Sequence, residues 1–169
     1  MKWLTIPILA IAIGLTTLAA LPGHAEDPAS PITDVKIRAG YRDWKLVSVA
    51  HEEGNLNDLR AILGNHIAVH AYREGILPFP DGAIIARLAW RYLSSEENNK
   101  VFGRRQSFVA GPPTNIQFMV KGAKMYASTG GWGFAQFNDG KPANIVVNDC
   151  YSRHIPVKDR DFLFTRYAP

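Results

Sequence analysis

The sequence contains a single cysteine, Cys150, among 169 residues. One cysteine cannot form a disulfide bond within its own chain. The cysteine and histidine spacings typical of structural zinc sites are also missing. Cys150 is therefore expected to be thioether-bonded, to be a free thiol, or to pair with a cysteine of another chain.

Concentrated charge is scarce as well. The chain has 19 lysine and arginine residues against 15 aspartate and glutamate residues, and no block of basic residues interleaved with aromatic ones. Because phosphate backbones are bound by concentrated basic stripes, we do not expect nucleic-acid binding. The G-x-S-x-G pattern of serine hydrolases and a phosphate-binding glycine loop are absent too.

The N-terminal region predicts export. Lys2 is followed by an apolar stretch over 4–21 and by Gly-His-Ala at 23–25. This order is typical of a secretory signal peptide over 1–25, which predicts a periplasmic or secreted protein. A retained membrane anchor is the alternative, since about 18 apolar residues can span a bilayer. We expect a flexible lead-in over 26–40 and one folded domain over 41–169.

The rest of the sequence predicts an α+β fold. Residue alternation and turn signals indicate strands, with the central one following the Pro-Asp-Gly turn at 80–82. Asn65 is a suitable N-cap for a helix that Gly75 ends. We expect a single domain with an antiparallel β-sheet flanked by a few helices on one side. The predicted strands are 45–51, 56–63, 83–90, 115–120 and 132–137; the predicted helices are 67–73 and 143–154; and 94–105 is expected to be a surface loop.

Cys150 and His154 are the strongest candidate site residues. Cys150 precedes His154 by four positions, which is the outer spacing of C-x-x-C-H, where two cysteines hold a haem and the histidine binds its iron. Arg153 occupies the position of the second cysteine. The alternative is that His154 is an ordinary surface histidine near the end of the chain.

Two further patterns have both a functional and a structural explanation. His66 and His70 lie four residues apart on the predicted helix and would share one face, as metal ligands can. An exposed, solvated pair is the simpler explanation. The Gly130-Gly131-Trp132-Gly133 segment could let a planar ligand approach the backbone, or it could be a turn with close packing.

Several segments in succession resemble the cytochrome P-460 family of exported bacterial c-type haem proteins, which includes the c′-beta cytochromes. They are Tyr41-Arg42-Asp43-Trp44, the segments 79–85 and 118–121, Gly130-Gly131-Trp132-Gly133, and 150–154 followed by 161–165. The resemblance implies an antiparallel sheet with flanking helices, and a homodimer. It also implies haem c with five-coordinate iron, whose open face binds nitric oxide or hydroxylamine.

The sequence departs from the family pattern at three positions. With Arg153 in place of a cysteine, Cys150 can form a single thioether at most, while His154 would be the iron ligand. The lysine that family members of the hydroxylamine-oxidising type cross-link to haem corresponds to Arg87, and a guanidinium is a poor nucleophile. The distal carboxylate of that type corresponds to Gln117, whose amide cannot shuttle a proton.

Three hypotheses follow. The first is a periplasmic haem protein that binds or scavenges small nitrogen oxides, with Arg87 and Gln117 as distal hydrogen-bond donors and with a redox protein as a further partner. The second is a hydroxylamine oxidase, which the residues at 87 and 117 disfavour. The third is a haem-free relative that acts as a binding or structural domain. For Arg87 itself, pairing with a carboxylate at the sheet surface is the alternative to a distal role.

Overall fold

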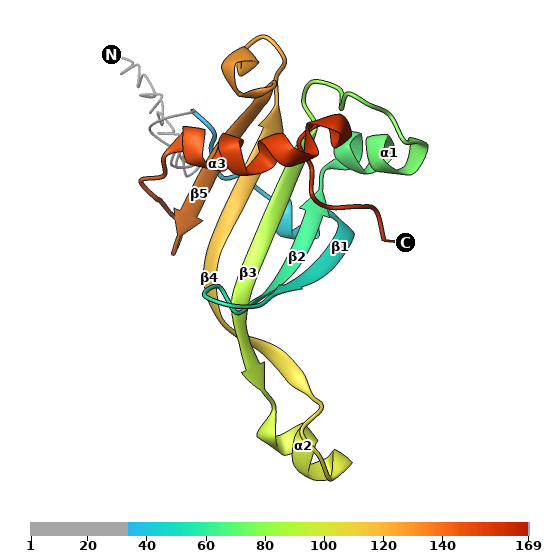
Figure 1. The fold of residues 1–169 in the computed structure, drawn as a ribbon, viewed down its shortest axis with the longest axis vertical. Coiled ribbons are helices and arrows are strands. Elements are labelled where there is room, and N and C mark those ends of the chain that lie inside the picture. The colour runs from blue at the N-terminus through green and yellow to red at the C-terminus, as the bar shows by residue number, and fades with distance from the viewer. Residues whose placement is uncertain (1–33, 169) are drawn as a thin grey trace, which may run out of the picture.

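The computed structural model describes residues 34–168, which form a six-stranded antiparallel sheet with helices (Figure 1). Each strand pairs with the next one along the chain, so the sheet is a simple meander in the order β1-β2-β3-β4-β5-β6. The predicted α+β class and the predicted strands are confirmed. The strands are β1 (Lys45–Glu52), β2 (Asp58–Gly64), β3 (Ile84–Ser94), β4 (Phe108–Lys121), β5 (Trp132–Asn138) and β6 (Lys141–Pro142).

The two faces of the sheet bury different sets of side chains, because successive residues of a strand point to opposite sides. One face, here called the α3 face, packs against the helices α1 (His66–Glu74) and α3 (Val147–His154). It carries Ile62, Ile85, Met119 and Phe134. The opposite face buries a second cluster, which is covered in part by Val35, Tyr41 and Trp44 from the segment before β1. This second cluster includes Leu63, Ala86, Leu88, Phe118, Val120, Ala135 and Phe137.

Helix α1 (His66–Glu74) begins and ends as the sequence predicts. The Asn65 side chain accepts a hydrogen bond from the Ala68 amide at 3.0 Å, which satisfies a free amide of the first turn. The same oxygen accepts from the Ile84 amide at 3.1 Å, so this cap also ties the helix to β3. Gly75 ends the helix in the left-handed conformation with φ 64°.

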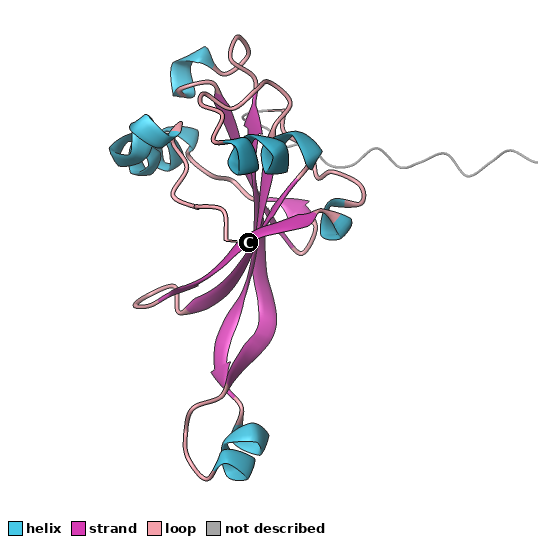
Figure 2. Cartoon of the chain, turned by 90° about the vertical axis from the view of Figure 1, so that its right-hand side faces the viewer, coloured by secondary structure: helices cyan, strands magenta, loops and turns pink. Residues whose placement is uncertain are grey.

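Strands β3 and β4 extend beyond the other strands as a two-stranded arm (Figure 2). The tip of this arm carries helix α2 (Glu96–Phe102), so the surface loop predicted over 94–105 is wrong. Ser95 caps the helix, and the buried Asn99 side chain accepts hydrogen bonds from the amides of Gln106 and Ser107 at 2.8 and 2.7 Å. A polar side chain therefore organises this tip. Helices are predicted from the spacing of buried apolar residues, and α2 lacks that signal.

The C-terminal segment crosses the α3 face of the sheet (Figure 1). Helix α3 (Val147–His154) starts four residues later than the predicted helix over 143–154 and continues into the 3-10 helix η3 (Ile155–Arg160). Helix α3 contacts β5 in the sheet. The predicted signal peptide over 1–25 lies outside the described residues. Within 34–168, none of the helices has the length and hydropathy needed to cross a membrane.

Candidate functional site

Helix α3 presents Cys150 and His154 on the side that faces the sheet. Val147, Cys150, Tyr151 and His154 are partly buried, while the residues between them are exposed. This spacing of three and four residues is one face of an α-helix. Cys150 and Tyr151 pack against the cluster that contains Phe134. The structure therefore brings the two predicted site residues together, one turn apart.

His154 is held in a fixed orientation. Its Nδ1 lies 2.6 Å from the carbonyl oxygen of Phe162. Its ring contacts the ring of Phe134 on β5, with centroids 5.2 Å apart, and that of Phe164, with centroids 5.0 Å apart. The imidazole is thus enclosed between the sheet and the C-terminal segment.

The hydrogen bond to Phe162 also sets the chemistry of the ring. A carbonyl oxygen only accepts, so the proton of neutral His154 must lie on Nδ1, which leaves the lone pair of Nε2 available to a metal. Burial lowers the pKa of His154 below its usual value, although the hydrogen bond to Phe162 opposes this. The neutral form that binds metals is therefore favoured.

Cys150 is a free, half-buried thiol. Burial raises its pKa, which nearby Arg153 lowers and Asp149 raises. The sulfur is therefore protonated near neutral pH. Arg153 is exposed.

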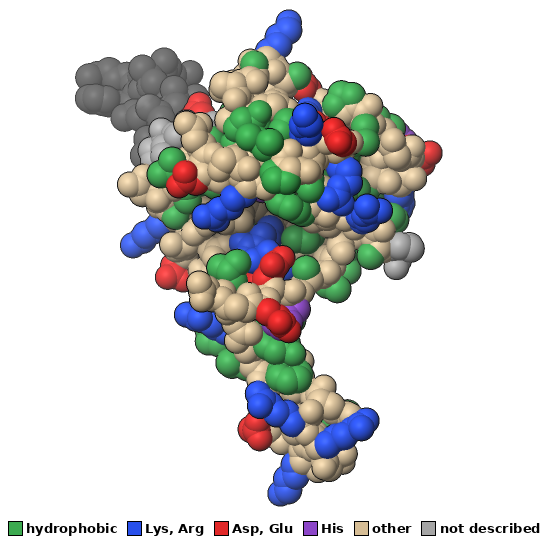
Figure 3. Space-filling view, in the orientation of Figure 1, with side chains coloured by type: hydrophobic (Ala, Val, Ile, Leu, Met, Phe, Trp, Pro, Cys, Tyr) green, Lys and Arg blue, Asp and Glu red, His purple; other side chains and the backbone are tan. Residues whose placement is uncertain are grey.

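The two predicted distal residues lie side by side on the α3 face. Arg87 pairs with Gln117 across β3 and β4, and Gln117 pairs with Gln136 across β4 and β5. We call Arg87, Gln117 and Gln136 the polar row. On each strand its member lies two residues from Ile85, Met119 or Phe134 and on the same face. The polar row is therefore adjacent to the ring that His154 contacts. Charged side chains gather in the hollow beside α3, over the middle of the sheet (Figure 3).

Arg87 is bound by a buried carboxylate. Its guanidinium donates hydrogen bonds to Asp58 and to Asn115, both at 2.9 Å. Asp58 is 2% exposed and also accepts from Arg60 at 2.8 Å. Burial lowers the pKa of Arg87 to about 10, so it stays charged at neutral pH. The pairing hypothesis is confirmed, with the carboxylate buried in the sheet instead of at its surface.

Each member of the polar row retains some hydrogen-bonding capacity. The Nε of Arg87 is buried and has no hydrogen-bond partner among the described residues. The Gln117 amide donates to Gln136 at 2.7 Å, and Gln136 donates to Asn138 at 3.1 Å. These amides can donate or accept but cannot transfer protons at neutral pH.

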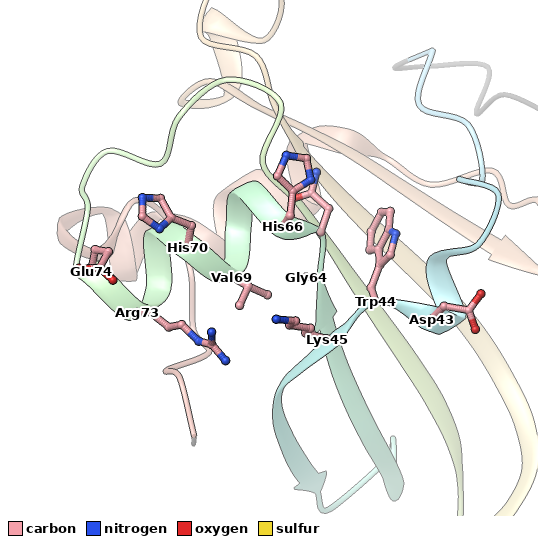
Figure 4. Close-up of a pocket in the computed structure, with 10 residues that line it drawn as sticks. Asp43, Trp44, Lys45, Gly64, His66, Val69, His70, Arg73 and Glu74 are labelled. Carbon is pink, nitrogen blue, oxygen red and sulfur yellow. The ribbon is translucent and has the colours of Figure 1, made fainter.

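His66 and His70 lie elsewhere, on the exposed side of α1. They line an open hollow of about 420 Å³ together with Trp44, Lys45 and Arg73. Figure 4 shows the two imidazoles standing apart, one turn from each other along α1. No group of three metal-binding side chains occurs in the part of the chain that the structure describes. The two histidines are exposed, as the simpler explanation requires.

The glycine segment before β5 is a turn with close packing. Gly130 and Gly131 have φ of 69° and 82°, a conformation that favours glycine. A Cβ on Gly130 would collide with the ring of Phe162, and one on Gly133 with the ring of Tyr126. The planar groups that approach this backbone are therefore side chains of the protein.

Sequence reasoning missed the residues that support the site. Asp58 and Asn115 reach Arg87 from distant parts of the chain, and the Phe162 carbonyl, eight residues beyond His154, reaches its ring. The charged pair Asp58 and Arg60, at alternate positions of one strand, is the signal that could have indicated a polar region on the α3 face. No local pattern marks the Phe162 carbonyl.

Cys150 and His154 on α3 are the residues that would hold a haem, Cys150 through one thioether and His154 through its imidazole. His154 has an oriented ring whose Nε2 keeps its lone pair, as proximal histidines require. Cys150 provides one sulfur on the same helix face, and Arg153 excludes a second. The donor chemistry therefore agrees with what the resemblance implies.

Comparison with known proteins gives one family. A search of curated proteins returns no match. The family model described as Cytochrome P460 matches residues 38–165, which include all six strands, α3 and the turn that carries the Phe162 carbonyl. The chain therefore belongs to the cytochrome P460 family, and this membership supports haem, with its iron, as the cofactor.

Proposed function

We propose that the chain is an exported haem protein that binds or scavenges nitric oxide or hydroxylamine. His154 would be the axial ligand of a five-coordinate iron, and Cys150 would hold the haem through a single thioether. The observation that carries this proposal is the hydrogen bond from His154 to the Phe162 carbonyl, at 2.6 Å. Bound haem would supply an iron with an open position for a small nitrogen ligand.

The polar row suits binding better than oxidation. Arg87 is charged and partnered by Asp58, so it cannot act as the nucleophile that a neutral lysine amine can become. The Gln117 amide can donate a hydrogen bond to a ligand but cannot relay protons as a carboxylate does. Both residues therefore favour a site that stabilises a bound ligand, and they argue against a hydroxylamine oxidase.

A haem-free binding or structural domain is the second candidate. The observation in its favour is that Cys150 and Tyr151 already pack against the cluster around Phe134. The hollow on α1 and a second one of about 240 Å³, near Tyr72 and Arg160, are both lined by residues other than Cys150 and His154. In this case Cys150 would be a free thiol or would pair with another chain.

Visible absorption of the protein purified from periplasm separates these candidates. We expect a Soret band that persists after acid-acetone extraction and that shifts when nitric oxide is added. An extractable band would mean iron ligation without the thioether. A strongly red-shifted ferrous Soret band would support the oxidase instead. A folded protein that stays colourless with excess haem would contradict the proposal and favour the haem-free candidate.

A further inference from the structure

A buried ion pair joins the end of β4 to the residue that follows η3. The Nζ of Lys121 lies 2.6 and 2.9 Å from the two carboxylate oxygens of Asp161. Lys121 is 6% exposed and Asp161 is 8% exposed. Ion pairs buried to this extent gain little net stability, because both charges lose their hydration. A buried pair of this kind can instead serve to fix one conformation.

Both members of the pair have further partners that define their positions. Asp161 accepts a hydrogen bond from the Phe79 amide at 2.8 Å. The Lys121 ammonium lies 3.4 Å from the Gly130 carbonyl oxygen and 4.9 Å from the centre of the Trp132 ring. The carboxylate of Asp161 is thus held from two directions, by β4 and by the segment before β3.

The backbone at Asp161 and Phe162 adopts an unfavourable conformation. Their φ values are 51° and 64°, in the left-handed region that non-glycine residues rarely enter, and here two such residues are consecutive. Conformations of this kind persist only where the surrounding structure enforces them. Lys121 holds the Asp161 side chain, while the ring of Phe162 occupies the space left by the missing side chain of Gly130.

This turn aims the Phe162 carbonyl oxygen at the Nδ1 of His154. The contacts run without interruption from Lys121 to Asp161, through one peptide bond to Phe162, and from its carbonyl to the imidazole. A backbone carbonyl in this position sets which ring nitrogen carries the proton and how the ring is oriented. Each link is a direct contact or a covalent bond.

We infer that Lys121 and Asp161 are positioning residues for His154, acting through the left-handed turn at 161–162. The inference rests on the proposed function, since it concerns the ring that would bind the iron. Neither residue needs to touch the haem. Their pairing fixes the carbonyl that orients the ligand, which explains why a buried ion pair and a strained turn occur together beside the candidate site.

A merely stabilising ion pair would behave differently. Replacing both charges leaves no unpaired buried ion, and such replacements are often neutral for stability. The double variant Lys121→Met/Asp161→Asn should therefore fold, since asparagine tolerates the left-handed region well. If the pair is purely structural, the His154 ring of this variant will have the same tautomer and the same ring-proton exchange as the wild type. If the pair positions His154, both will change.

The first measurement uses haem-free protein. Nitrogen-15 NMR of the histidine rings should show His154 of the wild type as a single tautomer, protonated at Nδ1, with a slowly exchanging ring proton. We expect the double variant and Asp161→Asn to show mixed tautomers and at least tenfold faster exchange. The single variant Lys121→Arg keeps the charge and should retain much of the wild-type tautomer and slow exchange. The control is Asn99→Ala, which removes a buried polar anchor from the distant arm.

The second measurement uses haem-loaded ferrous protein. Hydrogen-bond donation from Nδ1 makes the imidazole a more basic ligand, so the iron–histidine stretching frequency should fall in the double variant and stay unchanged in Asn99→Ala. A folded double variant with unaltered tautomer and exchange would overturn the inference. If the wild type takes up no haem, the proposed function fails separately, and the haem-free NMR result still decides the positioning role.

Discussion

The guanidinium of Arg87 and the carboxylate of Asp58 lie 2.9 Å apart on adjacent strands, facing the same side of the sheet as α3. Arg60 binds the same carboxylate and also contacts Glu52 at 3.0 Å. The two arginines and two acidic residues balance in charge. The region beside the candidate haem site is therefore polar but has no net charge from these four groups, as the uncharged ligands proposed above would require.

The first prediction concerns Asp58. Replacing it with leucine would leave Arg87 and Arg60, both largely buried, without their shared carboxylate. Removing one member of a buried ion pair costs about 3 kcal/mol or more, so we expect the free energy of unfolding to fall by that amount in urea denaturation. The matched control is Glu52→Gln, because Glu52 is half exposed. Exposed pairs contribute about 1 kcal/mol at most. Equal losses in the two variants would contradict this account.

The second prediction concerns the iron ligand. His154→Ala removes the only imidazole on α3, so haem content per protein should fall at least about tenfold, since even loss of a supporting group costs 10–100-fold in metal affinity. Haem content is measured from the pyridine haemochrome spectrum. The control is His70→Ala, which removes an exposed imidazole from α1 and should leave haem content unchanged. A wild-type haem level in His154→Ala would exclude this residue as the ligand.

The third prediction concerns Arg153. Its side chain is exposed, and it occupies the position of the second cysteine in C-x-x-C-H. Arg153→Cys should therefore raise the yield of haem that resists acid-acetone extraction, with mass spectrometry showing one haem per chain. Cys150→Ser is the complementary variant and should abolish extraction-resistant haem. Unchanged covalent haem in both variants would show that attachment does not use this helix.

Much of the fold could be predicted because local signals agree with the tertiary structure. Asn65 and Gly75 mark the two ends of α1, and the Pro-Asp-Gly turn comes just before the start of β3. Helix α2 was missed because it is short, polar, and organised by the buried Asn99. The predicted start of α3 is too early because Ile145 and Val146 continue the apolar spacing of the helix, which begins only at Val147.

The candidate site could be predicted in part. The spacing of Cys150 and His154 places them on one helix face, and the family resemblance indicated Arg87 and Gln117. The partner of Arg87 could not be found this way, because Asp58 stands opposite Arg91 in the sheet register and Arg87 reaches it diagonally along the strand. The direction of the Phe162 carbonyl depends on two consecutive residues in the left-handed conformation, which no sequence pattern predicts.

The fourth prediction concerns the thiol of Cys150 in haem-free protein. Burial is the main reason that its pKa lies above the ordinary value; Asp149 adds to this, while Arg153 opposes it. A raised pKa means a smaller thiolate fraction at any pH below it, and the thiolate is the form that reacts. The rate of alkylation by iodoacetamide should therefore be several-fold lower at pH 8 than for the same chain unfolded in urea.

The pH dependence of that rate gives the sharper test. Alkylation of the folded protein should rise along a curve displaced to higher pH than that of the unfolded chain, and Arg153→Gln should displace it further, because the nearby positive charge that favours the thiolate is gone. Asp149→Asn should move the curve the opposite way. A folded protein that reacts as fast as the unfolded chain at pH 8 would show that Cys150 does not face the sheet. In protein with a thioether-bound haem, the sulfur should not react at any pH.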